Sequence, residues 1–341
     1  MHIQLKQTAL LIALLAISGG CWKASPNEVV AYTALDSEFS EPIFAEFSRA
    51  TGLQVLPKFD VESTKTVGLT EAIIAERARP RCDVFWNNEI LHTLRLEKLG
   101  LLAEYTPAIA ATYPAEFRSS RGTWCGFAAR ARVLLVNTKL VNDNERPTSI
   151  RDLVAPEWRG RVAVAKPLFG TTATHAACLF AAWGDEPAEQ FFRDVKANAQ
   201  VLSGNKQVAQ AVAAGQVAFG LTDTDDAIVE VERGEPVAIV YPDQAEGQIG
   251  TLFIPNTISI LKDCPHPEAA RRLVDFVLSP AVEEQLAAGP SAQIPLGSQA
   301  TAAARVETPR TVRAMQVDFE AALEKWPIAA AFLRDEFTSA K

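Results

Sequence analysis

The sequence predicts an α/β protein of two lobes, each a mainly parallel sheet flanked by helices. From residue 29 onward, short apolar runs typical of buried strands alternate with longer stretches typical of helices, and this alternation indicates βαβ units. The 341 residues, 48% of them hydrophobic, are enough for two ordinary cores. Two polar stretches, 142–147 and 243–248, are candidate crossings between the lobes.

The first set of elements alternates regularly. Pro42 suits the first turn of its helix, and Gly52 and Gly100 each end a helix. The expected elements are strand 29–33, helix 40–52, strand 53–59, helix 69–79, strand 82–86 and helix 88–100.

The second set opens with a long strand and closes with an amphipathic tail that we expect to pack across the back. Its expected strands are 131–141, 161–165, 217–221, 237–241 and 256–261. Its expected helices are 171–183, 187–198, 206–215, 226–234, 267–279, 280–289 and the tail, 312–337.

The N-terminus predicts export. Lys6 precedes a short apolar core at 9–17, which is too short for a mature membrane span, so residues 1–20 are expected to be a signal peptide. Gly19-Gly20 before Cys21 is similar to a lipobox, in which the cysteine becomes lipidated. We therefore expect a membrane-anchored lipoprotein of the periplasm or cell envelope, with cleavage without a lipid as the alternative.

The net charge bears on the class of partner, and the cysteine content bears on disulfides. Loss of Lys6 with residues 1–20 moves the net charge from −8 to −9, which argues against nucleic acid because nucleic-acid binders carry a basic face. An exported protein can form disulfides, and four cysteines allow three pairings among which the sequence does not choose. These cysteines are Cys82, Cys125, Cys178 and Cys264.

Three carboxylates follow the expected strand 217–221 within four residues: Asp223, Asp225 and Asp226. Aspartate at a helix start accepts free backbone N–H groups and suits the positive end of the helix dipole. Ligands of open α/β sheets also bind at the carboxyl ends of strands. The cluster is therefore either a helix start or a ligand site.

Motifs of common enzymes are absent. The sequence has no G-x-S-x-G, no phosphate-binding G-x-x-x-x-G-K-[ST], no G-x-G-x-x-G and no H-E-x-x-H. Its four histidines are scattered. We therefore expect a binding protein without a cofactor rather than an enzyme.

Several stretches, in order, resemble the ferric-iron-binding type of periplasmic solute-binding protein that serves ABC importers. They are AYTALDSEFSEPIFAEFSRATGLQV, RCDVFWNNE, ARARVLLVNT, APEWRGRVAVAKP, QVAQAVAAGQVAFGLTD and PHPEAARRLVDFVLSPAVEEQLA. The resemblance implies a two-lobed type II periplasmic binding protein fold with a hinge and a ligand cleft. It places lobe 1 at 27–130 plus 246–290, and lobe 2 with the C-terminal helices at 131–245 plus 291–341.

The resemblance also implies site residues at strand ends. At the end of the first strand these are Thr33 and Asp36, of which Asp36 could equally be a helix cap. After DVFW the family often has a Glu, and here Asn88 and Glu89 stand at that point. Their alternative roles are helix capping for Asn88 and a first-turn acid for Glu89.

This chain departs from the family's pattern at the position of the metal ligands. Ferric binders have a Tyr-Tyr pair there, whereas this chain has Thr224-Asp225. Carboxylates are still hard oxygen donors, so Asp223 and Asp225 are the candidate metal ligands, if a metal is bound at all.

The family's anion position is better matched. Thr171 and Thr172 stand at a helix start, which can bind an anion. Asn205 stands where the family has an anion-contacting Asn. Arg130 and Arg132 could add positive charge, and pairing at the surface is the alternative for both.

These observations predict the substrate-binding lipoprotein of an ABC importer, a monomer that works with a permease and its ATPase. Its ligand would be Fe³⁺ with a bridging anion, as cargo, or a small zwitterion carrying phosphonate, phosphate or carboxylate. The alternatives are a tethered ligand-sensing receptor domain and a carboxylate-dependent hydrolase, which would need paired carboxyl groups across a scissile bond.

Overall fold

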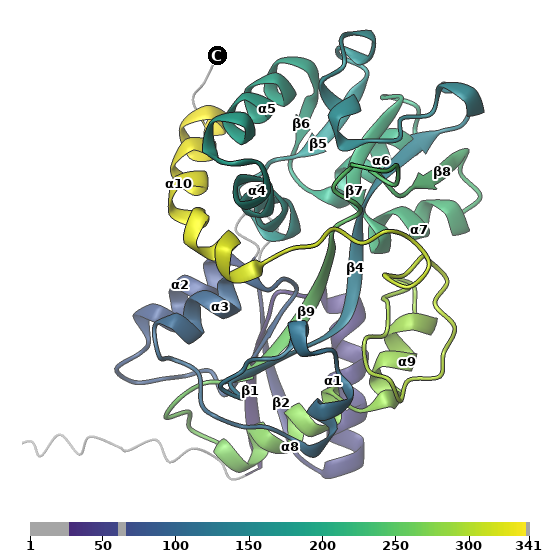
Figure 1. Cartoon of the computed structure of the whole chain (residues 1–341). Coiled ribbons are helices and arrows are strands. Elements are labelled where there is room, and N and C mark those ends of the chain that lie inside the picture. Colours follow the sequence, from purple (N-terminus) through teal and green to yellow (C-terminus); the bar gives the residue numbers. More distant parts are fainter. Residues whose placement is uncertain (1–26, 61–65, 339–341) are drawn as a thin grey trace, which may run out of the picture.

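The computed structural model describes residues 27–60 and 66–338, so the expected signal segment and Cys21 lie outside it. Two lobes lie one above the other, and the long strands β4 (Trp124–Asn137) and β9 (Phe253–Ile260) run between them (Figure 1). Together the strands form one continuous hydrogen-bonded order, β2-β1-β3-β9-β4-β7-β5-β6. The predicted two-lobed α/β architecture is therefore confirmed.

The lower lobe is built on β1 (Glu28–Thr33), which pairs in parallel with both β2 (Gln54–Phe59) and β3 (Val84–Asn87). β9 then pairs antiparallel with β3 and with the first part of β4. The helices of this lobe are α1 (Ser37–Thr51), α2 (Val67–Ala75), α3 (Leu91–Lys98), α8 (Pro267–Val277) and α9 (Pro280–Ala288).

The upper lobe is built on the second part of β4. It pairs antiparallel with β7 (Phe219–Asp223) and with β8 (Val237–Val240), while β5 (Val162–Ala165) is parallel to β7 and to β6 (Gln200–Leu202). The helices of this lobe are α4 (Gly170–Trp183), α5 (Asp185–Asn198), α6 (Asn205–Ala213) and α7 (Thr224–Glu232). The last helix, α10 (Phe319–Thr338), packs on α4 and α5 and also on α3, so it contacts both lobes.

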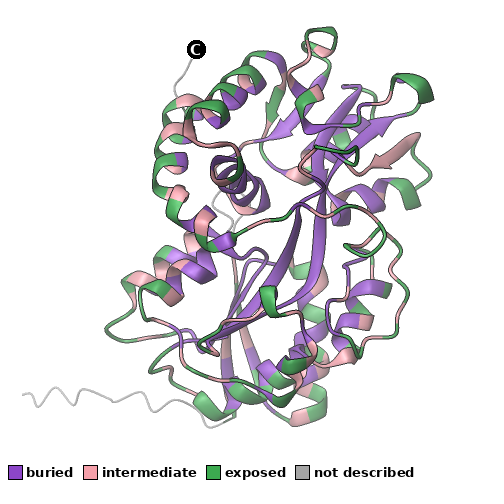
Figure 2. Ribbon diagram, in the orientation of Figure 1, coloured by how far each residue is buried: buried purple, intermediate pink, exposed green. Residues whose placement is uncertain are grey.

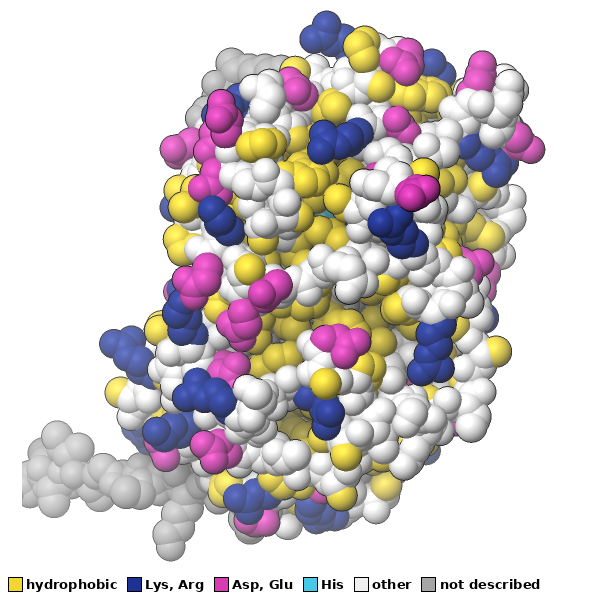
Figure 3. Space-filling view, in the orientation of Figure 1, with side chains coloured by type: hydrophobic (Ala, Val, Ile, Leu, Met, Phe, Trp, Pro, Cys, Tyr) yellow, Lys and Arg dark blue, Asp and Glu magenta, His cyan; other side chains and the backbone are white. Residues whose placement is uncertain are grey.

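Buried residues follow the central strands through both lobes, whereas β8 is half-buried (Figure 2). The parallel strands of the lower lobe run toward the upper lobe, and those of the upper lobe run toward the lower one, so their carboxyl ends meet between the lobes (Figure 1). On the face shown in Figure 3, basic and acidic side chains are interspersed. All four cysteines in the described chain are free thiols.

Two expected elements differ most from the structure, and α1 begins at Ser37, so Pro42 is inside the helix and not in its first turn. The strand expected at 131–141 is β4, which begins seven residues earlier and ends at Asn137, where the side-chain oxygen of Asn137 accepts the N–H groups of Lys139 and Leu140 and turns the chain. The tail helix begins at Phe319, not at 312. The residue limits predicted for the lobes stay a prediction.

An irregularity in β4 orients its two arginines. The pairing register with β9 shifts between Phe127 and Arg130, and Ala128 has a φ of 42°, in the left-handed region that is costly for a residue with a side chain. Such bulges bend a strand and redirect the side chains that follow. Here the redirected side chains are Arg130 and Arg132.

Candidate ligand site between the lobes

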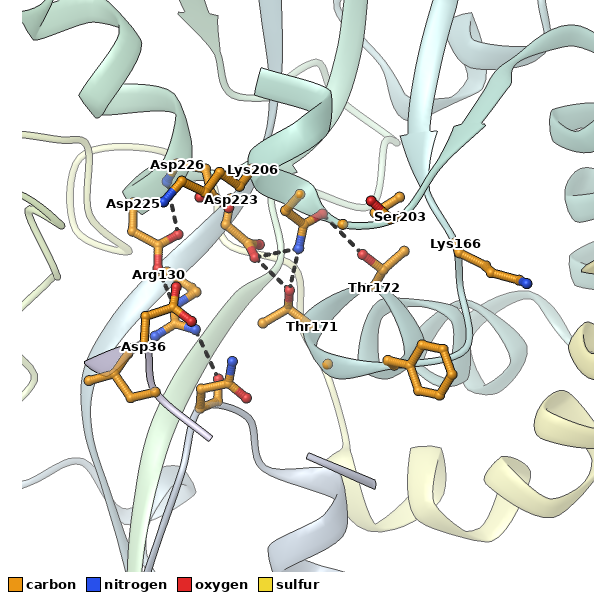
Figure 4. A pocket seen from close by; sticks show the side chains of 17 residues that line it. Asp36, Arg130, Lys166, Thr171, Thr172, Ser203, Lys206, Asp223, Asp225 and Asp226 are labelled. Atoms are coloured by element: carbon orange, nitrogen blue, oxygen red, sulfur yellow. Dashed lines mark hydrogen bonds and ion pairs between the residues drawn. The ribbon is translucent and has the colours of Figure 1, made fainter. Parts of the chain in front are cut away.

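A pocket lies between the lobes, where the carboxyl ends of two sets of parallel strands meet (Figure 4). About 620 Å³ of space between its walls is free of protein atoms, a figure that includes open solvent. The segments that line it follow β1, β3, β5, β6 and β7, together with Arg130 of β4. Its polar lining residues are Asp36, Asn88, Arg130, Lys166, Thr171, Thr172, Ser203, Asn205, Lys206, Asp223, Asp225 and Asp226.

Two helices present their N-termini to the pocket. Phe169 to Thr172 form the start of α4, and Ser203 to Lys206 form the start of α6. The free N–H groups and the dipole of a helix start attract anions. Lys166, which follows β5, adds a positive charge, and no carboxylate in the described chain pairs with it. This side of the pocket can therefore bind an anionic group.

The pocket also carries four acids, and one of them, Asp223, is already bonded to residues at the starts of α4 and α6. Arg132 Nη1 donates to Asp223 Oδ1 at 2.7 Å, while Thr171 Oγ1 and Asn205 Nδ2 donate to Asp223 Oδ2 at 2.5 and 2.8 Å. Arg132 and Asp223 are direct partners across the β4–β7 ladder, so the sheet register itself creates the pair. Their side chains are 0% and 4% exposed.

The same network holds the hydroxyl groups of α4. Arg132 donates to Thr171 and Thr172 at 3.3 Å and to Asn205 Oδ1 at 3.1 Å. Asp223 occupies the N-cap position of α7, yet its side chain makes no capping hydrogen bond. The carboxylate of Asp223 is therefore held by the arginine network and not by the helix start.

Asp225 has a looser partner. Its Oδ2 lies 3.2 Å from Arg130 Nε, close enough for an ion pair but without hydrogen-bond alignment. The other nitrogens of Arg130 donate to the carbonyl of Asn88 at 3.1 Å and to Asn256 Oδ1 at 3.2 Å. The Asp225 side chain is 11% exposed, so this carboxylate is the more accessible of the two.

The surroundings of Arg132 exclude water. His175, one turn after Thr171 on α4, is buried, and its Nδ1 has no hydrogen-bond partner. Burial, and secondarily the positive charge of Arg132, lowers the pKa of His175 to about 3. The imidazole is therefore neutral at physiological pH, and Arg132 remains the cation that balances Asp223.

The three aspartates offer oxygen atoms within 4.8 Å of one another, a spacing at which a metal ion could be held. Fe³⁺ prefers such hard donors. Two of the three carboxylates, however, face buried guanidinium groups, and a cation bound there would lie within a few ångströms of Arg130 and Arg132. The charges around these three aspartates therefore fit a bare trivalent cation poorly.

Most site residues predicted from the sequence line this pocket. Asp36 is at the N-cap position of α1 without a side-chain capping bond. The residues that line it are Asp36, Asn88, Thr171, Thr172, Asn205, Asp223 and Asp225. Their contact with a solute stays a prediction.

Three other predicted residues do not line the pocket. The buried hydroxyl of Thr33 accepts the N–H of Leu35, and that of Thr224 accepts the N–H of Ala131. Glu89 points into the protein, where its carboxylate accepts the N–H groups of the first turn of α3. All three side chains accept backbone N–H groups, and their contact with a solute stays a prediction.

Sequence analysis missed Lys166, Ser203 and Lys206, which also line the pocket. Each directly follows a strand or begins a helix at the carboxyl edge of the upper sheet. The position of Lys166 directly after β5 could have identified it as a pocket residue. β6, only three residues long, was not recognised, so nothing in the pattern drew attention to Ser203.

The family model for bacterial extracellular solute-binding proteins matches residues 92–323. The chain belongs to this family. A relative from Serratia marcescens, the Fe(3+)-binding periplasmic protein, is 28% identical over 214 residues, and the match spans 62% of each chain. Iron uptake protein A1 of a Synechocystis strain is 27% identical, and that match spans 76% of this chain and 74% of the relative.

Solved structures agree with the fold. Iron-bound HitA from Pseudomonas aeruginosa is 26% identical with a TM-score of 0.82, covering 91% of this chain and 99% of that one. The expected family and fold are thus confirmed, and the protein is a solute-binding protein whose relatives are periplasmic binding proteins, not enzymes. In the described residues, no helix is both long and apolar enough to cross a membrane.

Proposed function

We propose that the protein captures a small anionic solute between its lobes and delivers it to the permease and ATPase of an ABC importer. The observation that carries this proposal is the buried Arg132–Asp223 pair, which removes one candidate metal ligand from the pocket. An anionic group can still bind at the starts of α4 and α6, together with Lys166.

The charge balance favours a solute with both signs. The lining acids are matched one for one by basic groups, if Arg132 directly behind them is included: Asp36, Asp223, Asp225 and Asp226 against Arg130, Arg132, Lys166 and Lys206. Acids and Lys166 lie at opposite ends of the pocket (Figure 4). A phosphonate or phosphate at the α4 side and an amine beside Asp36 and Asp225 would match both ends.

Ferric iron with a bridging anion is the second candidate. It is supported by the spacing of the three aspartates and by the iron-binding names of the relatives. Binding of this cargo would require Arg130 to release Asp225 and the anion to offset the guanidinium charges. We place it second because breaking a buried ion pair is costly.

Calorimetric titration separates the two candidates. We expect inorganic phosphate and 2-aminoethylphosphonate to bind to the chelator-treated wild type, and the aminophosphonate to bind more tightly. Ferric citrate should give no metal-dependent binding beyond that of citrate alone. Binding of ferric iron at one ion per chain, with no binding of either phosphorus compound, would reverse the order of the candidates.

The anchor is a separate part of the proposal. Gly19-Gly20-Cys21 supports lipidation of Cys21 after removal of residues 1–20, and two acyl chains hold a protein stably at a membrane. The Cys21→Ser change should release the protein into the soluble fraction. If the wild type is already soluble and carries no lipid, the anchor is excluded, and a monomer free in the periplasm replaces it.

A further inference from the structure

Glu89 is a buried carboxylate that the pocket does not use. It stands between β3 and α3 and is 0% exposed. Its Oε2 accepts the N–H of Leu91 at 2.5 Å, and its Oε1 accepts the N–H of His92 at 3.0 Å and the side-chain amide of Asn87 at 2.7 Å. Three donors from the lower lobe therefore already stabilise the charge.

A fourth donor comes from the upper lobe. Thr174 Oγ1 lies 2.8 Å from Glu89 Oε2, and both residues are buried. Thr174 is on α4, one turn after Gly170, which lines the pocket. Thr174 itself does not line the pocket, so this bond connects the lower lobe to the helix that carries the anion-binding side without contacting a solute.

The hydroxyl of Thr174 has a second acceptor within reach. Its Oγ1 is 3.3 Å from the carbonyl oxygen of Gly170, four residues earlier on the same helix. A threonine hydroxyl has a single proton to donate, and a bond to the i−4 carbonyl is a common alternative for threonine in helices. The proton can therefore go either to Glu89 or to Gly170, and neither lobe is left with an unsatisfied group.

We infer that Thr174 and Glu89 are a positioning pair that favours the closed arrangement of the lobes. When the lobes are together, Thr174 donates to the Glu89 carboxylate. When they separate, it donates to the Gly170 carbonyl, and Glu89 keeps its three donors. The bond to a charged acceptor is the stronger of the two, so the exchange stabilises closure. Closure favoured by this pair would raise solute affinity only if the solute binds at the start of α4, and this step therefore rests on the proposed function.

An exposed contact between the same lobes provides a comparison. Lys206 Nζ lies 3.4 Å from Glu38 Oε1, and both side chains are about half exposed. Exposed pairs of this kind contribute little. Glu38→Gln is therefore the matched control, because it removes an interlobe contact at the surface and leaves the buried one in place.

The test measures the distance between the lobes without any solute, so that it is independent of the proposed function. Spin labels at Ala45→Cys and Gln210→Cys, both exposed positions on α1 and α6, report the separation by double electron–electron resonance. The background is Cys21→Ser, Cys264→Ser, which leaves only buried cysteines. We expect Thr174→Val to lower the ratio of closed to open molecules about tenfold.

Thr174→Ser keeps the hydroxyl and should retain the wild-type ratio, and Glu38→Gln should change it by no more than about twofold. If Thr174→Val reduces expression, Thr174→Ala makes the same test. A distance distribution unchanged by loss of the hydroxyl would overturn the inference, as would an equal shift in Thr174→Ser. A drop in melting temperature with an unchanged distribution would mean that Thr174 only stabilises the fold.

Discussion

Asp223 and Asp225 are two residues apart at the start of α7, and each faces an arginine of β4, yet their surroundings differ. Asp223 accepts from Arg132, Thr171 and Asn205 in a network that is almost completely buried. Asp225 has a longer ion-pair contact with Arg130, its Oδ1 accepts the N–H of Asp226, and the residue borders the pocket. The two acids look equivalent in the sequence, but we expect the first to stabilise the fold and the second to influence solute binding.

The difference comes from the sheet. Asp223 is the last residue of β7 and lies directly opposite Arg132 in the ladder, whereas Asp225 is already in the first turn of α7. A buried charge without its partner is much more costly than an exposed one. Variants of the two acids should therefore separate stability from binding.

The largest expected effect is on stability. Asp223→Asn leaves Arg132 buried without a compensating charge, so we expect the free energy of unfolding to fall by about 3–5 kcal/mol. Urea denaturation measures this change. Asp226→Asn, at the rim, is the control and should cost less than about 1 kcal/mol. Equal losses for both variants would remove the distinction between the buried network and the pocket acids.

The next prediction tests whether water is excluded from His175 beside Arg132. Folded His175 stays neutral down to a pKa of about 3, whereas in the unfolded chain it takes up a proton near pH 6.5. Between these values the unfolded state binds more protons, so stability falls as the pH falls. From pH 7 to 5 the wild type should lose about 2 kcal/mol more than His175→Gln. Identical pH profiles from denaturant titrations would indicate a hydrated histidine.

Asp225→Asn should have a smaller effect on stability, about 1 kcal/mol or less, because its ion pair with Arg130 is longer and its side chain is partly exposed. Its effect on binding depends on the solute. Loss of the negative charge should raise the affinity for inorganic phosphate about threefold and lower that for 2-aminoethylphosphonate by a similar factor. Calorimetry with both compounds measures the two changes, and a parallel change would contradict the assignment of Asp225 to the amine end.

Lys166→Gln should change stability least, since no carboxylate of the described chain pairs with Lys166. We expect weaker phosphate binding, by about threefold to fivefold, because one positive charge beside the helix starts is lost. Lys262→Gln, on the surface away from the pocket, is the matched control. An equal loss for both variants would mean that only the overall charge matters.

Much of this molecule follows from local patterns. The alternation of apolar runs and amphipathic helices predicted the two-lobed fold, and strand ends predicted seven pocket residues. Partners across the sheet could not be predicted, because the register that places Arg132 opposite Asp223 joins β4 to β7, two strands far apart in the sequence. Sequence analysis therefore left both arginines as possible surface pairs. It left Glu89 as either a cleft residue or a first-turn acid, and the carboxylate accepts two N–H groups of the first turn of α3.

We propose that the buried arginine–aspartate network leaves a pocket for a small anionic solute and not for bare ferric iron. Native mass spectrometry of the wild type, purified without added ligand, tests this most directly, because it weighs what the pocket retains. We predict a mass excess of one small organic anion per chain, with no iron, that is lost when the protein is unfolded. One iron ion per chain, retained after treatment with a chelator of weakly bound metal, would contradict the account.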